Sequence, residues 1–325
     1  MHEVHKTARV FVAGHRGLVG SAILRKLHDA GFSNVLTASR AQLDLRDQGA
    51  VNDWFQASRP EYVYLVAGTV GGILANGTRP AEFIYDNMMI HATVVHAAHL
   101  FDAKRLLYLG SSCIYPRDAP QPMQEEHLLS GYLEPTNEPY AVAKIARIKL
   151  GQAYRKQYGS NFISAMPTNL YGPHDNFDLD SSHVMAALIR RFHEAKLAGV
   201  EEVSIWGTGS ARREFLHVDD LADACLFLME NYDRSKHINV GTGADITIRE
   251  LAETVREIVA PSVEFTFDTG RPEGSPRKLL DLSRLHALGW HHEIELREGI
   301  ESTYSWFREN YAEAIGERPG RVAAV

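Results

Sequence analysis

The stretch RVFVAGHRGLVGSAILRKL, residues 9–27, decides the fold. Its apolar start predicts a buried strand, which leads directly into three glycines, Gly14, Gly17 and Gly20, and a helix beginning near Leu18. In such a turn the first glycine allows the tight bend, the second lets the backbone approach a pyrophosphate, and the third permits close helix packing. The helix N-terminus adds free N–H groups and a partial positive charge. The order strand, glycines, helix therefore predicts a dinucleotide-binding turn.

Beyond this turn, short apolar runs alternate with helix-length amphipathic segments, a pattern typical of a parallel sheet with crossover helices. The predicted strands are RVFVAG from Arg9, VLTAS from Val35, YVYLVAG from Tyr62, RLLYLGSS from Arg105, FISAMPTN from Phe162 and HINVGT from His237. Helices are predicted over 19–31, 81–101 and 139–158. We therefore expect an α/β fold with a doubly wound parallel sheet of the Rossmann type.

After about residue 170 the alternation loosens, and breaks rich in glycine and proline follow: YGPHDNF, WGTGSARRE and TGRPEGSPRK. These breaks indicate a smaller C-terminal substrate-binding lobe that is interleaved with the sheet. We expect a dinucleotide-binding domain over 1–170 plus about 214–243. The second lobe is expected over about 171–213 and 244–325.

Composition excludes several classes of function. The chain has 325 residues, is 45% hydrophobic and carries a formal charge of −7 without a Lys/Arg block, so no nucleic-acid partner is expected. No apolar run reaches the length of a membrane span, and MHEVHKTA lacks the layout of a signal peptide. Two cysteines, Cys113 and Cys225, make no disulfide framework. We expect a cytoplasmic protein without a metal centre.

The end of the second strand favours NADP(H) over NAD as the cofactor. NAD sites usually place an acidic residue there, whereas this chain reads TASRAQLDL, with Arg40 at that point. Together with Arg16 in the glycine turn, Arg40 offers guanidinium groups suited to a 2′-phosphate. Asp44 follows and is a candidate contact toward the adenine. Alternatively, Arg40 is an ordinary solvated arginine.

Tyr140 and Lys144 lie four residues apart in NEPYAVAKIA, so a helix places both on one face. A nearby ammonium lowers the pKa of a tyrosine hydroxyl, which can then exchange a proton with a substrate alcohol or ketone. A serine at a strand's carboxyl end, Ser111 or Ser112 in GSSCIYP, can hydrogen-bond the same oxygen. Lys144 is also a candidate contact for the cofactor ribose. By itself the spacing equally suits a lysine lying over a half-buried ring.

The glycine turn, the strand-end serine and the Tyr-Lys pair, in that order, resemble the extended short-chain dehydrogenase/reductase family. Within it, the chain resembles the members that epimerise and reduce GDP-keto-sugars. The motifs that carry this nearly end-to-end resemblance are VAGHRGLVGSAI, VGGILAN, GSSCIYP, LEPTNEPYAVAKIA, MPTNLYGPHDNF, RREFLHVDD, INVGTG and PRKLLD.

The resemblance implies conversion of GDP-4-keto-6-deoxy-D-mannose to GDP-L-fucose with NADPH. Cys113 would be the base and His183 the acid for inversion at C3 and C5, because thiols and imidazoles can titrate near neutral pH. Ser111, Tyr140 and Lys144 would serve reduction at C4. Without the resemblance, Cys113 would be interpreted as a small buried apolar residue and His183 as a surface histidine.

The resemblance also assigns the GDP-sugar contacts and a homodimer formed through the long helices. The implied substrate-binding residues are Asn169, Arg191, Trp206, Arg213 and Lys278. In LHVDD, either Asp219 or Asp220 is expected to cap the following helix. The chain departs from the family pattern at Arg147, where a small residue is usual, and at Gly68 and Thr69 after the third strand.

Three alternatives remain open. One is a related epimerase-reductase, such as a colitose-type enzyme that inverts only C5, since pocket shape alone could decide that difference. A 4-epimerase or 4,6-dehydratase fits less well, because the second strand lacks the acidic end and CIYP follows the strand-end serines. The third is a non-catalytic NADP-binding sensor on the same fold. Retention of the five candidate catalytic residues argues against a sensor.

Overall fold

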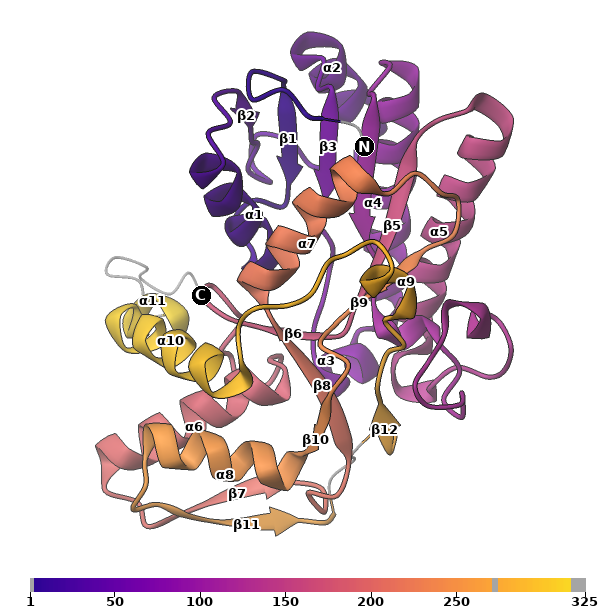
Figure 1. The fold of residues 1–325 in the computed structure, drawn as a ribbon. Helices are drawn as coiled ribbons and strands as arrows, with labels where there is room; N and C mark the ends of the chain where they lie inside the picture. The colour runs from indigo at the N-terminus through magenta and orange to yellow at the C-terminus, as the bar shows by residue number, and fades with distance from the viewer. Residues whose placement is uncertain (1–2, 271–273, 317–325) are drawn as a thin grey trace.

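The computed structural model describes residues 3–270 and 274–316, and a six-stranded parallel sheet forms its centre (Figure 1). The strand order is β2-β1-β3-β4-β5-β9. The bounds are β1 Val10–Ala13, β2 Val35–Leu36, β3 Tyr62–Leu65, β4 Arg105–Leu109, β5 Phe162–Pro167 and β9 Ile238–Val240. Each strand lies within one of the six predicted segments, so those predictions are confirmed. The strand order reverses at β1, which has β2 on one side and β3 on the other.

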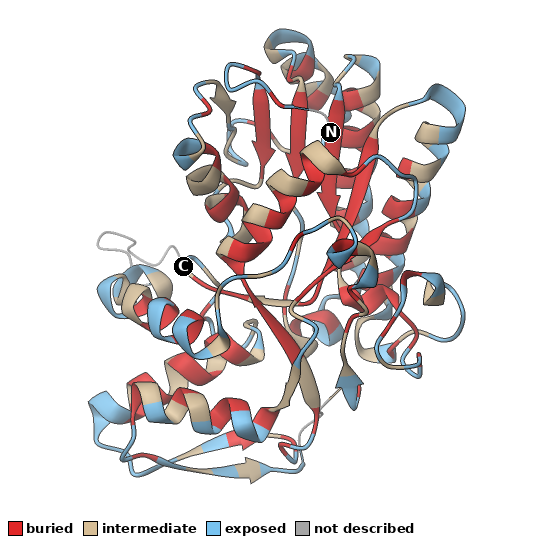
Figure 2. Ribbon diagram, in the orientation of Figure 1, coloured by how far each residue is buried: buried red, intermediate tan, exposed pale blue. Residues whose placement is uncertain are grey.

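Helices cover both faces of this sheet, which confirms the doubly wound class. One face carries α1 and α7, and the other carries α2, α4 and α5. Their bounds are α1 Leu18–Asp29, α2 Gln48–Ser58, α4 Pro80–Leu100, α5 Glu138–Tyr158 and α7 Val218–Asn231. Within β1, Val10 and Val12 pack on the α1 side while Phe11 and Ala13 pack on the α2 side. The strands β1, β3, β4, β5 and β9 therefore read as continuous apolar runs and lie buried, while the edge strand β2 is only partly buried (Figure 2).

Short elements follow the strands at their carboxyl ends. The helix α3, Ile73–Thr78, comes after β3, and the 3₁₀ turn η1, Ser112–Ile114, comes after β4. Two further 3₁₀ turns, η2 Glu125–His127 and η3 Pro135–Asn137, precede α5. The short helix α9, Ser283–His286, packs against β9. Of the candidate catalytic residues, Ser111 and Cys113 lie in these connections.

The second half of the chain builds two smaller sheets below the main one (Figure 1). In one, the central strand β8 pairs with β6, β10 and β12, and in the other β7 pairs with β11. The strand bounds are β6 Asn169–Tyr171, β7 Glu202–Trp206, β8 Arg212–His217, β10 Asp245–Thr247, β11 Glu264–Asp268 and β12 Arg277–Lys278. The helices are α6 Val184–Ala198, α8 Ile248–Val259, α10 Leu296–Glu309 and α11 Tyr311–Ala314. Their apolar faces meet in a separate core cluster.

Two features of this half bear on the sequence predictions. The helix α7 begins at Val218, and its N-cap is His217, whose Nδ1 accepts the N–H of Asp219 at 3.3 Å. The expected aspartate cap was therefore wrong, because Asp220 points away and accepts the N–H of Ile294 at 3.0 Å. The break TGRPEGSPRK includes residues 271–273, which lie outside the described residues.

Neither 3–270 nor 274–316 contains a helix long and apolar enough to cross a membrane. In the same ranges, no three histidine, cysteine or carboxylate side chains come together in a way that could hold a metal ion.

Candidate active site

The glycine turn has the geometry that a dinucleotide phosphate requires. Gly14 has φ +97°, and a Cβ placed there would lie 2.7 Å from the amide nitrogen of Ala67. A Cβ on Gly20 would lie 2.1 Å from the carbonyl oxygen of Gly14, so α1 can approach the turn only with glycine at this position. Gly17, by contrast, has only one neighbour near its Cβ position, at 3.7 Å, and α1 begins there without a side-chain cap. The first N–H groups of α1 are thus available to phosphate oxygens.

The two arginines expected at the 2′-phosphate are both exposed, Arg16 in the glycine turn and Arg40 in the turn after β2. Asp44 is engaged differently from the expectation. Its carboxylate accepts hydrogen bonds from Arg46, whose Nη2 lies 2.7 Å from Oδ2. These hydrogen bonds lower the pKa of Asp44 to about 2. Arg46 also contacts Asp86 at 2.9 Å. An adenine contact by Asp44 stays a prediction, and no pattern in the sequence pointed to Arg46.

The carboxyl end of β4 brings a serine and a cysteine to one point. The Oγ of Ser111 accepts the N–H of Cys113 at 3.4 Å and lies near enough to the Tyr140 hydroxyl to oppose the rise in its pKa that burial causes. Ser112 is 6% exposed and points into the protein. Cys113 and Tyr140 belong to one small apolar cluster, together with Phe83. Geometry therefore favours Ser111 over Ser112 as the partner of the tyrosine.

Tyr140 and Lys144 lie on the first two turns of α5 and share one face. The Nζ of Lys144 lies 5.3 Å from the centroid of the Tyr140 ring and donates to the carbonyl oxygen of Leu109 at 3.4 Å. Burial, followed by the charge of Arg147, lowers the pKa of Lys144 to about 7. Burial raises the pKa of Tyr140 well above its usual value. A charged lysine beside this hydroxyl would oppose that rise.

His183 is the N-cap residue of α6, and the loop after β3 holds the segment before it. The N–H of Gly72 donates to the carbonyl oxygen of Ser181 at 2.9 Å. A Cβ on Gly72 would lie 2.6 Å from the carbonyl oxygen of Ser182, so only glycine allows this approach. The position of His183 therefore depends on a contact between segments more than one hundred residues apart.

Two cations from neighbouring strands complete the same site. Lys278 in β12 is the register partner of Arg213 in β8. Burial raises the pKa of Cys113 and lowers that of His183, and the charge of Lys278 opposes the first change and adds to the second, so Lys278 lies within electrostatic reach of both side chains. Residues from the main sheet, from α6 and from β12 are thus brought together at the carboxyl edge of the sheet.

A base and an acid that were ready to react would rest as a thiolate and an imidazolium, but the Cys113–His183 pair does not. Burial raises the pKa of the Cys113 thiol, although Lys278 and Ser111 act in the opposite direction. The side chain of His183 is exposed, yet the surrounding protein removes enough solvent to lower its pKa, and Lys278 adds to that effect. At neutral pH the pair therefore rests as a thiol and a neutral imidazole. A thiolate and an imidazolium would hold the same total number of protons, so the two states differ only in which side chain carries the transferable proton.

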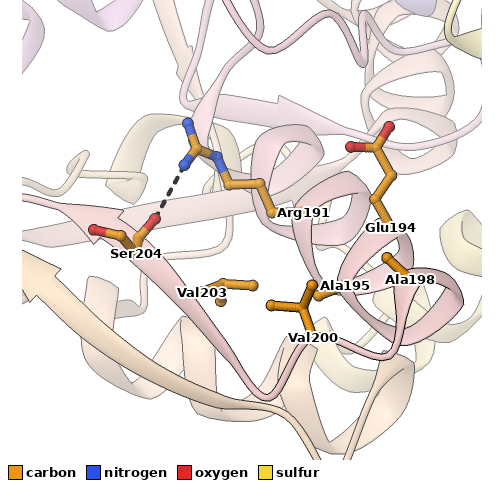
Figure 3. Close-up of a pocket in the computed structure, with 7 residues that line it drawn as sticks. All are labelled: Arg191, Glu194, Ala195, Ala198, Val200, Val203 and Ser204. Carbon is orange, nitrogen blue, oxygen red and sulfur yellow. Dashed lines mark hydrogen bonds between the residues drawn. The ribbon is translucent and has the colours of Figure 1, made fainter.

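Of the remaining substrate-binding candidates, Arg191 and Trp206 lie beside each other, and Asn169 contacts a different strand. Arg191 on α6 donates to the carbonyl oxygen of Ser204 at 3.0 Å, and its guanidinium lies 5.9 Å from the Trp206 ring centroid. Figure 3 shows Arg191 and Ser204 at a cavity of about 320 Å³ between α6 and β7. Its lining residues are Arg191, Glu194, Ala195, Ala198, Val200, Val203 and Ser204. Asn169, at the start of β6, donates to the carbonyl oxygen of Glu214 at 2.7 Å.

A dinucleotide turn and a Ser-Tyr-Lys group at the carboxyl edge of a doubly wound sheet define a Rossmann-type oxidoreductase. The model of the NAD dependent epimerase/dehydratase family matches residues 10–241, and the chain belongs to this family.

Within the family, the chain is similar to proteins named GDP-L-fucose synthase. It is 56% identical over 305 residues to GDP-L-fucose synthase 1 of Arabidopsis thaliana, with 94% of each chain covered. It is 55% identical to GDP-L-fucose synthase of Escherichia coli, covering 93% of this chain and 97% of that one. GDP-L-colitose synthase of Yersinia pseudotuberculosis is 36% identical, covering 92% of this chain and 97% of the other.

A solved structure agrees with these relatives. The GDP-L-fucose synthetase of Naegleria fowleri bound to NADP superposes with a TM-score of 0.90 at 27% identity, covering 96% of each chain. The structural similarity therefore extends over nearly the whole of both chains.

Proposed function

We propose that this protein converts GDP-4-keto-6-deoxy-D-mannose to GDP-L-fucose by epimerisation at C3 and C5 and NADPH-dependent reduction at C4. The observation that carries the proposal is the meeting of two sets of groups at one strand end. Ser111, Tyr140 and Lys144 form the reductive set, and Cys113 lies against the same tyrosine. Relatives named GDP-L-fucose synthase, at more than half identity, support the same product.

The cofactor is NADP(H), which supplies the hydride to C4 when bound. The glycine turn fits its pyrophosphate, because Gly17 leaves the N-terminus of α1 open while Gly14 and Gly20 hold the turn close to the sheet. Arg16 and Arg40 supply charge for the 2′-phosphate. Lys144 would hold the ribose hydroxyls near the nicotinamide.

The epimerisation follows from the acidity of the substrate. The ketone at C4 acidifies the hydrogens at C3 and C5, and inversion requires a base on one ring face and an acid on the other. Once the thiol proton has moved to the imidazole, the Cys113 thiolate removes the ring proton and the His183 imidazolium returns one to the opposite face, which restores the thiol and the neutral imidazole. Lys278 favours the thiolate that this step needs, while Ser111 and Tyr140 hydrogen-bond the C4 oxygen as it gains charge.

The reduction uses the same hydrogen bonds to the C4 oxygen. Tyr140 gives its hydroxyl proton to that oxygen as C4 becomes an alcohol, and the charged form of Lys144 stabilises the phenolate left behind. Because one oxygen is held throughout, the ring need not leave the site between the two reactions.

The division into lobes suits a nucleotide sugar. We propose that residues 1–170 and about 214–243 bind NADP(H) and that about 171–213 and 244–325 bind the GDP-sugar. Arg213 and Lys278 would contact the diphosphate or sugar, with Asn169 near the sugar. Arg191 and Trp206 would line the nucleotide end, where the cation already lies beside the indole ring.

The direct test is NADPH oxidation by the purified protein given GDP-4-keto-6-deoxymannose, with the product identified by NMR. Oxidation that yields GDP-L-fucose supports both halves of the proposal. Oxidation to a product inverted at C5 alone would indicate a colitose-type reaction, although the colitose synthase is the less similar relative at 36% identity. Binding of NADPH without oxidation would favour the sensor.

We also propose that the protein acts in the cytoplasm as a homodimer formed through α4 and α5. These helices pack on each other and leave large apolar side chains exposed, with Tyr85 60% and Met88 46% exposed on α4 and Val142 40% exposed on α5. Sedimentation of the wild type and of Met88→Asp tests the interface. A dimeric wild type and a monomeric variant are expected, and a monomeric wild type would contradict the dimer.

A further inference from the structure

Arg147 lies on α5 just beyond Lys144 and is buried, with 1% of its surface exposed. Its Nη1 donates to the carbonyl oxygen of Leu109 at 2.8 Å and lies 2.9 Å from Nε2 of His91. Its Nη2 donates to the carbonyl oxygen of Leu65 at 2.6 Å. The guanidinium thus joins the carboxyl ends of β3 and β4 to both long helices.

These partners are unusual for a buried arginine because none of them is a carboxylate. Burial is costly for an unpaired charge, and it lowers the pKa of Arg147 to about 9. His91 can receive the guanidinium N–H only through a neutral ring nitrogen, and burial together with the Arg147 charge holds the pKa of His91 well below its usual value. The pair therefore carries one positive charge at neutral pH, and that charge belongs to Arg147.

Lys144 reaches the same carbonyl oxygen as Arg147. Its Nζ donates to Leu109 at 3.4 Å, so two cationic side chains converge on one acceptor. The groups that act on Lys144 are Tyr140 and Arg147 on its own helix, His91 from α4 and Cys113 from η1. Of the described residues in this set, none is a carboxylate that would compensate for Arg147.

We propose that Arg147 is a positioning residue for Lys144: it fixes the Leu109 carbonyl that both side chains contact, and its charge opposes the ammonium form of Lys144. This inference rests on the proposed function, in which Lys144 supports reduction.

If Arg147 acts on Lys144 in this way, replacing Arg147 should change how the rate of reduction depends on pH. The ammonium form of Lys144 supports proton transfer by Tyr140, and this form is lost as pH rises through its pKa of about 7. Removing a neighbouring positive charge raises the pKa of a lysine. Arg147→Met should therefore keep reduction active to higher pH than in the wild type.

The test is a titration of Lys144 in the full chain labelled with ¹³Cε-lysine, followed by NMR without substrate and assigned with Lys144→Arg. Arg147→Met should raise the titration midpoint by about one pH unit or more. Arg147→Lys keeps a positive charge at this position, so its Lys144 midpoint should lie close to the wild-type value. An unchanged midpoint in Arg147→Met would overturn the proposal.

Arg105→Met is the matched control. Arg105 is 6% exposed, lies at the opposite end of β4 and donates to the carbonyl oxygen of Met229 at 2.5 Å. Its loss should lower stability without moving the Lys144 midpoint, and an equal shift there would mean a general loosening rather than a charge effect. If Arg147→Met does not fold, Arg147→Gln, which keeps an amide donor without charge, should show the same rise.

Kinetics then separate this inference from the proposed function. In Arg147→Met the alkaline limb of substrate-dependent NADPH oxidation should move upward together with the NMR midpoint. A midpoint shift in a protein without turnover would leave the effect on Lys144 intact and reject only the enzymatic role. A kinetic profile that stays in place while the midpoint moves would remove Lys144 from reduction.

Discussion

The two halves of the candidate site are built in different ways. The reductive half comes from one strand end and one helix, since Ser111 follows β4 and Tyr140 and Lys144 share a face of α5. The epimerisation half is assembled from distant segments: Cys113 from η1, His183 from the start of α6 and Lys278 from β12. The first half depends on local geometry, and the second depends on how the lobes meet.

This difference teaches where each activity is vulnerable. In the reductive half, Tyr140 and Lys144 are buried, and Lys144 donates to the backbone of the main sheet at Leu109. In the epimerisation half, His183 is exposed and is held by the approach of Gly72 to the segment before it. Perturbing the loop after β3 should therefore damage epimerisation while leaving reduction nearly intact.

The largest effect is expected from removal of the base. Cys113→Ser should lower hydrogen exchange at C3 and C5 by about 10⁴-fold, because a serine hydroxyl does not ionise near neutral pH. Solvent deuterium incorporation, measured by NMR, checks this. Cys225→Ser, at the other buried cysteine, is the control and should leave exchange unchanged. Retained exchange in Cys113→Ser would remove this residue as the base.

Tyr140→Phe should separate the halves in the opposite sense. Loss of the proton donor should lower NADPH oxidation by about 10³-fold, while exchange at C3 and C5 continues. Tyr154→Phe is the matched control, since Tyr154 lies on the same helix and its hydroxyl contacts His96 at 2.7 Å. Wild-type oxidation rates in Tyr140→Phe would contradict the assignment.

Gly72→Ala tests the comparison most directly. The new Cβ would lie 2.6 Å from the Ser182 carbonyl oxygen, so the segment that carries His183 must shift. We expect about 10²-fold slower exchange, because small displacements of a catalytic group are costly, with normal reduction of the epimerised substrate. The control is Gly77→Ala in α3, where a Cβ has no neighbour within 4 Å. Equal loss of both reactions would show that the halves are not independently positioned.

The sequence predicted most of the fold and the reductive half for a physical reason. Strand runs, the glycine turn and the Tyr140–Lys144 spacing are local patterns, and each was found where it was expected. Contacts between distant segments leave no such pattern. Nothing in the local sequence indicated that Gly72 meets Ser182, and Cys113 and His183 were named only through resemblance.

The sequence also did not predict which polar partner each of several side chains would contact. Arg147 was noticed as a departure, but its burial against two strand ends follows only from the packing of α5 on the sheet. Asp44 was expected to face the adenine, yet an arginine two residues later binds its carboxylate. At α7, the imidazole of His217 capped the helix in place of the aspartates. In each case several polar partners were available, and three-dimensional proximity decided between them.

Arg40→Ala extends the comparison to the cofactor. Loss of a charge-assisted contact to the 2′-phosphate should weaken NADPH binding by about 30-fold and leave NADH binding nearly unchanged. Fluorescence titration with both cofactors measures this, with Arg234→Ala as an equally exposed control. Equal losses for the two cofactors would contradict the 2′-phosphate assignment.

The smallest effect concerns stability and tests whether the reductive half is as buried as its contacts indicate. The pKa of Lys144 is about 7 in the folded protein and is restored to the usual lysine value on unfolding, so between these values the unfolded chain binds more protons. Stability should therefore rise with pH in this window, by about 1.4 kcal/mol per pH unit from this residue. Below pH 7 the penalty of burying the ammonium is fully present.

Lys144→Met removes this dependence. Urea unfolding of wild type and variant at pH 7 and pH 9 should show the variant's advantage shrinking as pH rises, because the wild-type lysine becomes neutral in the folded state. Lys149→Met, at an exposed lysine of the same helix, should run parallel to the wild type. If the stability of Lys144→Met changes with pH in the same way as that of the wild type, water reaches the Lys144 ammonium in solution. The reductive half would then be as open as the epimerisation half, and the contrast between them would lie only in how far apart their residues stand in the chain.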